Sequence, residues 1–219
     1  MNNDQAFNNK RIIELIEQSK KIAIIPSKIA GTDAFCAGVG LYYILKDHSK
    51  DVHFIYPGRL PENTNDLIED NDITSDVKQS NLTIRIDYSG TDASQVHYAT
   101  EDDVLTLTVS PIPNDFDKND RITTGISGHE FDLMFIIGAQ EKRDLGGTAK
   151  ALEKQMDYAK LINLDVTNKN TKYGAINIID ISVNSLSMLI YKHMSGWNLL
   201  PSEKSAKALL TGIISKEKS

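Results

Sequence analysis

The feature that most constrains the fold is the order of three apolar segments near the start of the chain. The run KIAIIP (21–26) has the length and composition of a buried strand, and the loop SKIAGT follows it. Residues 33–48 then predict a helix with an apolar face and small residues suited to close packing. A second strand is expected at 52–57, VHFIYP. This order favours a parallel sheet with a right-handed crossover.

The same strand and helix rhythm returns in the last third of the chain. Its expected elements, together with an amphipathic helix before the first strand, are a helix at 5–20, strands at 131–138, 161–165 and 174–179, and helices at 147–158, 182–194 and 202–214. We therefore expect an α/β fold in which helices flank a mainly parallel sheet, with residues 1–219 forming a single domain.

The middle of the chain follows a different pattern. Residues 58–80 are polar and rich in turn formers, with a short helix possible at PENTNDLIED (61–70). The segments LTIRID, QVHYAT and VLTLTVS then alternate apolar and polar residues, which is typical of antiparallel strands. We expect residues 80–125 to form a small antiparallel β-meander inserted into the α/β domain.

Composition and charge limit the classes of partner. The 24 basic residues are dispersed among 30 acidic ones, for a net charge of -6, which disfavours non-specific nucleic-acid binding but permits a small phosphate ligand in a local pocket. No run approaches the roughly 18 apolar residues of a spanning helix, and the first ten residues lack a signal-peptide core. We expect a soluble, cytoplasmic protein in which the single cysteine, Cys36, is a core residue. The sequence does not predict an oligomeric state.

Four segments, in order, resemble the motifs of the DHH phosphoesterase superfamily. Residues 27–37 (SKIAGTDAFCA) correspond to H-x-N-P-D-G-D-A-x-G-S, and FDLMFIIG to the strand that ends in the second motif. Residues 164–180 (LDVTNKNTKYGAINIID) correspond to I-D-H-H-x-x-N-x-x-F-G-x-x-N-x-x-D, and 211–217 (TGIISKE) to T-G-I-x-x-D-T. The most specific matches flank the third motif: Asn170, Tyr173, Gly174, Asn177 and Asp180.

The resemblance implies a two-metal phosphoesterase site whose ligands are mostly lost. In this family, histidines and carboxylates hold two divalent ions, usually manganese, which clamp the phosphate and activate a water. Only Asp33 and Asp165 match as remnants. The positions at which this chain departs from the family are Ser27, Gly31, Gly138, Val166, Thr167 and Lys216.

These departures favour a non-catalytic, DHH-like pseudoenzyme that binds a protein or a small phosphorylated ligand, with no metal or cofactor. The alternative is a phosphoesterase using manganese or magnesium in an altered site, acting on short oligonucleotides or other phosphodiesters or phosphoanhydrides. Active relatives also continue into a smaller substrate-binding domain, which we expect to be absent here. A third hypothesis is therefore a fragment, natural or truncated, whose missing domain carries the binding.

The first motif supplies most of the candidate ligand-binding residues. Ser27, Gly31, Thr32 and Asp33 lie between a strand and a helix start, where backbone N–H groups can face an anion at the carboxyl edge of a sheet. For Asp33 the alternative is a capping role, because hydroxyl and carboxylate groups near a helix start satisfy free N–H groups.

Further candidates lie near the second motif and within the third. Arg143 could contact a phosphate, or could simply pair with Glu141 or Asp144. Asp165 is either a cation ligand or part of an Asx turn. Asn170 is a candidate ligand residue through its place in the third motif.

Two further hypotheses concern the inserted region and the end of the chain. Residues 80–125 offer an edge that a partner strand could extend, or else a lid over the crevice. Lys216 could pair with Asp33 or Asp165 in place of a metal ion, or could lie in a solvated tail.

Overall fold

The computed structural model describes residues 3–75, 77, 81–90, 95–127 and 131–217. The chain divides into two compact units, one comprising residues 1–78 with 129–219 and the other residues 79–128. The residues expected to form the inserted β region, 80–125, lie in the second unit. The two units are described separately.

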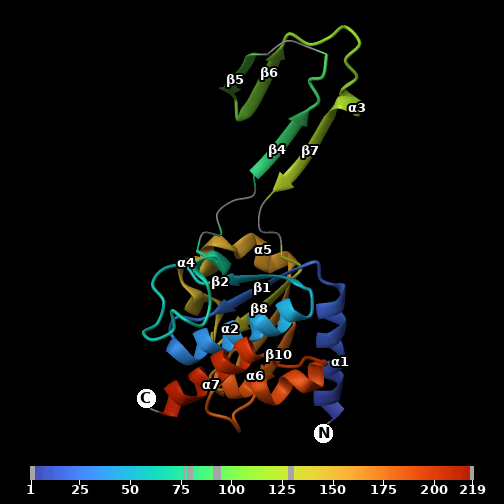
Figure 1. The fold of residues 1–219 in the computed structure, drawn as a ribbon. Coiled ribbons are helices and arrows are strands. Elements are labelled where there is room, and N and C mark those ends of the chain that lie inside the picture. Colours follow the sequence, from blue (N-terminus) through green and yellow to red (C-terminus); the bar gives the residue numbers. More distant parts are fainter. Residues whose placement is uncertain (1–2, 76, 78–80, 91–94, 128–130, 218–219) are drawn as a thin grey trace. The chain divides into compact units, whose positions relative to one another are not determined.

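The first unit is built on a six-stranded sheet in the order β10-β9-β8-β1-β2-β3 (Figure 1). Every neighbouring pair is parallel. The predicted α/β class is therefore confirmed. The strands are β1 (Lys21–Pro26), β2 (Asp51–Ile55), β3 (Ile73–Thr74), β8 (Leu133–Ile137), β9 (Lys160–Asp165) and β10 (Ile176–Ile179).

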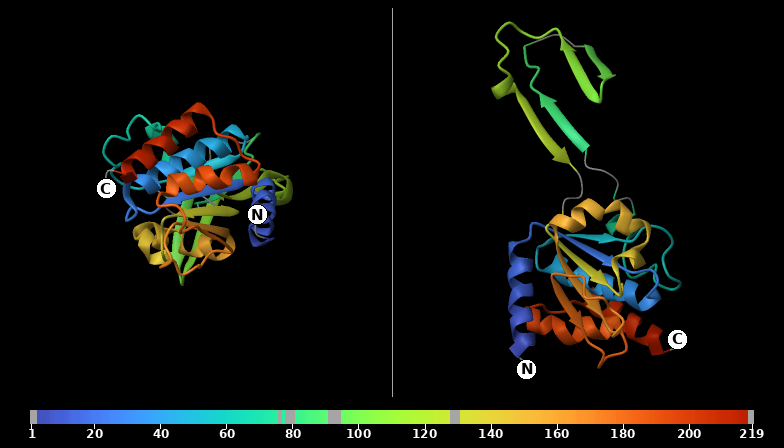
Figure 2. Two further views of the ribbon diagram at one scale, coloured as in Figure 1. Left: turned by 90° about the horizontal axis from the view of Figure 1, so that it is seen from below. Right: turned by 180° about the vertical axis from the view of Figure 1, so that it is seen from behind.

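Helices cover both faces of this sheet (Figure 2). Their bounds are α1 (Asn3–Gln18), α2 (Gly31–Asp47), α4 (Gly147–Ala151), α5 (Glu153–Tyr158), α6 (Leu186–Met194) and α7 (Glu203–Glu217), with 3-10 turns η1 (Asp70–Asp72), η2 (Lys142–Leu145) and η3 (Ser195–Trp197). Among the helices in the described ranges, none is long and apolar enough to cross a membrane.

The alternation of strand side chains divides the core into two layers. Ile24 and Phe135 point into the layer formed with α1, α2, α6 and α7. Ile25 and Ile136, their neighbours along the strands, point into the layer that includes Met156 of α5. Both faces of the central strands are thus buried, as expected for the continuous apolar runs of a parallel sheet.

Glycines bring α2 and α7 into close contact. A Cβ added at Gly40 would lie 2.5 Å from a Leu209 methyl carbon, and one at Gly212 would lie 2.8 Å from the Cβ of Cys36. Neither position therefore has space for a side chain. The close packing predicted from the small residues of 33–48 is confirmed.

The short helix considered at 61–70 is not formed. Asn63 has a positive φ of 59°, which interrupts a right-handed helix, and the Thr64 hydroxyl donates to the Pro61 carbonyl in a turn. The chain stays irregular until η1, although Leu67 and Ile68 are buried. The helix expected at 147–158 is present as α4 and α5, separated at Leu152.

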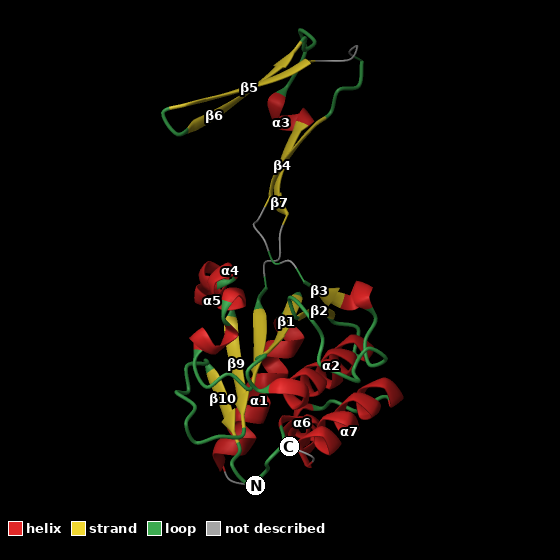
Figure 3. Ribbon diagram, turned by 90° about the vertical axis from the view of Figure 1, so that its left-hand side faces the viewer, coloured by secondary structure: helices red, strands yellow, loops and turns green. Residues whose placement is uncertain are grey.

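The second unit contains two antiparallel strand pairs rather than a meander (Figure 3). Strand β4 pairs with β7, which was not predicted, and β5 pairs with β6 between them in sequence. The elements are β4 (Asn81–Ile86), β5 (Gln95–Glu101), β6 (Val104–Ser110), α3 (Lys118–Arg121) and β7 (Ile122–Ser127).

The β5–β6 ribbon is amphipathic. The register pairs Tyr98 with Leu107 and Thr100 with Leu105 on one face, and His97 with Thr108 on the other. The apolar face is exposed, and Tyr98 retains 78% of its accessible area. We call the set Val96, Tyr98, Leu105 and Leu107 the ribbon face.

Candidate functional site

The carboxyl edge of the sheet contains a topological switch point between β1 and β8. From β1 the chain crosses to β2 on one side, and from β8 it crosses to β9 on the other. The backbone N–H of Ser27 donates to the Ile137 carbonyl at 2.8 Å, so the two strand ends are adjacent. In open α/β sheets, ligands bind at such a point because the diverging loops leave a crevice.

Asp33, in the first turn of α2, is directed to the start of α6. Its carboxylate accepts hydrogen bonds from the N–H groups of Leu186 (2.6 Å) and Ser187 (3.0 Å) and from the Ser185 hydroxyl (2.9 Å). Asp33 is 5% exposed. A negative charge at a helix N-terminus is stabilising, so Asp33 caps α6 rather than its own helix. The capping alternative therefore applies, but to a different helix from the one expected.

Gly138, immediately after β8, has a positive φ of 72° and little free space. A Cβ added there would lie 2.7 Å from Leu186 Cδ1 and 2.8 Å from the Cβ of Ala30. Apolar atoms of α6 and of the β1–α2 loop thus occupy the volume next to this strand end. Without a shift of these neighbours, no residue larger than glycine fits here.

The other first-motif residues differ in exposure. Ser27 is buried, and its hydroxyl donates to the Asp144 carbonyl at 3.4 Å. Gly31 has a positive φ of 71°, and a Cβ added there would meet nothing within 4 Å. Thr32 is half-buried next to it.

Asp165 and Asn170 form a buried polar cluster at the end of β9. The Asp165 carboxylate accepts from its neighbour Val166 N–H (2.8 Å) and from Asn170 Nδ2 (2.7 Å). Asn170 also donates to the Ala139 carbonyl and accepts from the N–H of Lys172. Both side chains therefore act on the loop after β9, which they fix in one conformation.

Two more asparagines extend this cluster toward β10. Asn163 Nδ2 donates to the side-chain oxygens of Asn170 (2.6 Å) and Asn177 (3.1 Å). Asn177 in turn exchanges two hydrogen bonds with the backbone of Gly174. Asn170, Asn177 and Gly174 are thus joined in one network with Asn163, which the sequence did not single out. The carboxylate of Asp180, the last matching position, instead accepts from Lys192 and Ser182.

Tyr173 closes the cluster. Its hydroxyl donates to the Ala139 carbonyl at 3.1 Å. Burial, followed by the negative charges of Asp165 and Asp144, raises the pKa of Tyr173, so that the phenol stays protonated and keeps this hydrogen bond.

The side chains of three further positions in the resembling motifs, Val166, Thr167 and Lys216, do not belong to this polar cluster. Val166 and Thr167 are half-buried, and the Thr167 hydroxyl accepts from the N–H of Lys169. Lys216 is exposed in the last turn of α7, where no ion pair involves it within the described part of the chain. The proposed pair with Asp33 or Asp165 is not formed. The alternative, a solvated residue, agrees with the exposure of Lys216, although this residue lies in the last turn of α7 rather than in a tail.

Cys36 is a fully buried residue of α2. Burial, and to a lesser extent the charge of Asp33, raises the pKa of the Cys36 thiol to about 12. The neutral thiol is a poor nucleophile, which agrees with a packing role.

A cavity of about 530 Å³ lies beside the switch point. Its walls come from the β1–α2 loop, the segments after β2 and β3, and the loop after β8. We call this cavity the switch-point crevice, and its lining is Lys28, Ile29, Pro57, Ser75, Val77, Arg143, Asp144, Leu145, Gly146, Gly147, Thr148 and Ala151. Of the residues predicted to bind a ligand, Arg143 belongs to this lining.

Among the described residues, two cations and one carboxylate line the crevice. The Lys28 ammonium lies 5.5 Å from the centre of the Tyr56 ring, and within the described ranges it has no ion pair. Arg143 is paired with Glu141 at 2.5 Å, as one of the alternatives predicted. The Asp144 carboxylate accepts from the N–H groups of Gln140 and Glu141. Lys28 therefore offers the positive charge that suits an anion, whereas the charge of Arg143 is balanced by Glu141.

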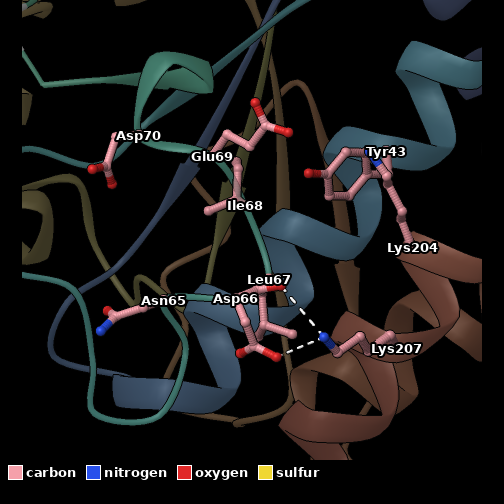
Figure 4. Close-up of a pocket in the computed structure, with 9 residues that line it drawn as sticks. All are labelled: Tyr43, Asn65, Asp66, Leu67, Ile68, Glu69, Asp70, Lys204 and Lys207. Atoms are coloured by element: carbon pink, nitrogen blue, oxygen red, sulfur yellow. Dashed lines mark hydrogen bonds and ion pairs between the residues drawn. The ribbon is translucent and has the colours of Figure 1, made fainter.

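A larger cavity, of about 750 Å³, lies away from the strands (Figure 4). Tyr43 of α2, the loop 65–70, and Lys204 and Lys207 of α7 line it. The Lys207 ammonium is already bound to the Asp66 carboxylate at 2.6 Å. The smaller crevice is the better candidate site, because it lies at the switch point of the sheet.

Lys28 was not anticipated from the sequence. It stands in the position after Ser27, inside the segment that resembles the first motif, but the family pattern leaves this position undefined. The available signal was positional, since it is a cation two residues beyond the end of a buried parallel strand.

Comparison with known proteins supports the resemblance to phosphoesterases only at the level of the fold. No family model and no curated protein matches the sequence. Among solved structures, the chain is similar to an exopolyphosphatase-related protein from Bacteroides fragilis, with a TM-score of 0.59 and 15% sequence identity. The match covers 96% of this chain and 50% of that one, so this chain spans half the length of the matched protein.

Proposed function

We propose that this chain is a non-catalytic, phosphoesterase-like domain that binds a small phosphorylated ligand in the switch-point crevice. The observation that carries the proposal is the packing at Gly138. In the family that the sequence resembles, a bridging aspartate stands there, whereas here Leu186 and Ala30 leave no space for a side chain.

The remaining positions do not fit a pair of divalent ions either. Such a site needs several anionic oxygens and imidazoles that converge on the metals. The Asp33 carboxylate is bonded to three groups at the start of α6, and the Asp165 carboxylate to Val166 and Asn170. Within the described ranges, no three His, Cys, Asp or Glu side chains are grouped so that they could hold a metal ion.

Binding of an anion needs no metal in this arrangement. Lys28 and Arg143 supply positive charge at the carboxyl edge of the sheet, and guanidinium groups bind phosphate through paired hydrogen bonds. The likeness to an exopolyphosphatase-related protein supports a fold of the kind that handles phosphate groups.

Isothermal titration with manganese, and separately with phenyl phosphate, tests the proposal. We expect no stoichiometric manganese binding, and phenyl phosphate binding that weakens several-fold in Lys28→Gln. Metal-dependent hydrolysis of a chromogenic phosphodiester that is lost in a folded Asp33→Asn variant would instead establish the phosphoesterase alternative.

One observation favours protein binding as a second candidate function. The ribbon face carries no charge and is exposed, although a two-stranded ribbon alone is only marginally stable in water. We propose that a second copy of the chain covers it, because two uncharged faces can pack without burying an unpaired charge.

Sedimentation velocity over a range of protein concentrations tests this association. We expect a dimer that Leu105→Asp dissociates, while Thr106→Asp, on the opposite face of the same strand, leaves it intact. A wild-type protein that stays monomeric at all concentrations contradicts the proposal.

A further inference from the structure

Apart from two cations, the Asp144 carboxylate and two hydroxyl groups, the described side chains that line the switch-point crevice are apolar. Five of the side chains in its lining carry no polar group: Ile29, Pro57, Val77, Leu145 and Ala151. Ile29 is 76% exposed at this wall, whereas Val77 and Leu145 are buried beneath it. A ligand that is charged throughout would leave this wall in contact with water.

We infer that the ligand is a phosphate monoester with an uncharged, apolar body, such as an aryl or alkyl phosphate. This inference rests on the proposed phosphate binding and adds the chemistry of the remainder of the ligand. A volume of about 530 Å³ is within the range of small-molecule sites, which are mainly apolar with a few polar groups that fix orientation. The phosphate lies between the two cations, and the body covers Ile29 and Val77.

The two cations contribute differently. Lys28 lies against Tyr56 without a carboxylate partner among the described residues, so its ammonium is available without rearrangement. Arg143 must exchange Glu141 for the phosphate, and the exposure of its side chain, 82%, leaves it free to turn. Glu141 therefore competes with the ligand, and removing its charge strengthens binding.

Fluorescence titration with 1-naphthyl phosphate tests the inference, with inorganic phosphate and 1-naphthol as the matched probes. We expect 1-naphthyl phosphate to bind at least about tenfold more tightly than inorganic phosphate, because burying part of the ring against the wall contributes at least about 1.4 kcal/mol. Lys28→Gln weakens both phosphate probes, and Glu141→Gln strengthens both.

The Ile29→Asn variant distinguishes the contribution of the apolar body to the affinity from that of the phosphate. We expect it to weaken 1-naphthyl phosphate several-fold and to leave inorganic phosphate unchanged. Ile181→Asn is the control, because Ile181 is similarly exposed, at 68%, and lies outside the crevice lining. Lys142→Gln is the charge control for Lys28→Gln, since Lys142 does not line the crevice.

The outcomes distinguish the inference from the proposed function. Equal affinity for inorganic and naphthyl phosphate, or no effect of Ile29→Asn, overturns the apolar body and leaves phosphate binding standing. Binding of 1-naphthol as tight as that of its phosphate overturns both, because the cavity then has no preference for an anion. No binding of any probe also overturns both.

Discussion

The carboxylate of Asp33 on α2 accepts a hydrogen bond of 2.6 Å from the backbone N–H of Leu186, the first residue of α6. The two residues are 153 positions apart in the sequence. One of the two aspartates that match the metal-site motifs thus holds together two helices of the core. Its chemistry in this chain is that of a helix cap.

Replacing Asp33 by alanine should therefore destabilise the fold. The change leaves the N–H groups of Leu186 and Ser187 buried without a partner, and we expect a loss of about 2–3 kcal/mol in the free energy of unfolding. Urea unfolding followed by the fluorescence of the single tryptophan, Trp197, measures it. Asp157→Ala, at an exposed aspartate of α5, is the control. A stability unchanged by Asp33→Ala contradicts the capping role.

Gly138 and Gly31 form a matched pair for testing the packing at the switch point. Both have a positive φ, so alanine costs about 1–2 kcal/mol of backbone strain at either position. Only at Gly138 does the new Cβ also meet Leu186 and Ala30, which adds about 1–3 kcal/mol. We expect Gly138→Ala to be the more destabilising in the same urea assay. Equal losses would show that the volume beside Gly138 adapts easily.

Asn170→Ala should loosen the loop after β9. The side chain joins Asp165, Asn163, Ala139 and Lys172, and its loss leaves buried polar groups unpaired, at an expected cost of about 2–3 kcal/mol. Amide hydrogen exchange should accelerate at Lys172 and Gly174. Asn168→Ala, at an exposed neighbour, should leave both amides protected. Unchanged exchange in Asn170→Ala would show that the cluster does not fix the loop.

Because His193 is buried, we expect the free energy of unfolding to fall on mild acidification. Burial lowers the pKa of this histidine more than the partner carboxylate of Asp180 raises it. Asp180 stays ionised here, because hydrogen bonds from Lys192, Ser182 and His193 outweigh burial and hold its pKa below the usual range. The unfolded chain therefore takes up the histidine proton first, and stability falls as the pH drops below about 6.5.

The slope of unfolding free energy against pH between 7 and 5 measures this effect. We expect a shallower slope in His193→Gln than in the wild type. His97→Gln, at an exposed histidine of β5, should keep the wild-type slope. Parallel curves for wild type and His193→Gln would rule out the histidine as the source.

The α/β frame was readable from the sequence because local composition determines it. The short apolar runs around Ile24 and Phe135 have the composition of strands that are buried on both faces. Small residues such as Gly40 predict close contacts between helices. The secondary-structure predictions are wrong where the local sequence pattern is weak or where residues distant in the sequence determine the structure. The threonine-rich strand β7 has little apolar patterning, and Asn63 breaks a segment that otherwise reads as a short helix.

The candidate site was less predictable for the same reason. The motif resemblance places Gly138 where that family has a metal ligand, but the residue next to its Cα, Leu186, comes from a helix beginning 48 positions later. Asp33 likewise reads as either a ligand or a local cap, since only the fold brings the start of α6 to it. Lys28 becomes a candidate ligand-binding residue only because the fold places it in the lining of the switch-point crevice.

The pairing of β4 with β7 brings the entry and exit of the inserted segment together. Asn81 and Ser127 are register partners in neighbouring strands, which lie about 5 Å apart in the hydrogen-bonding direction. A short glycine linker could therefore replace everything between them without changing the path of the α/β chain on either side. Joining Asn81 to Ser127 by such a linker is thus expected to leave the strand order of the α/β unit unchanged.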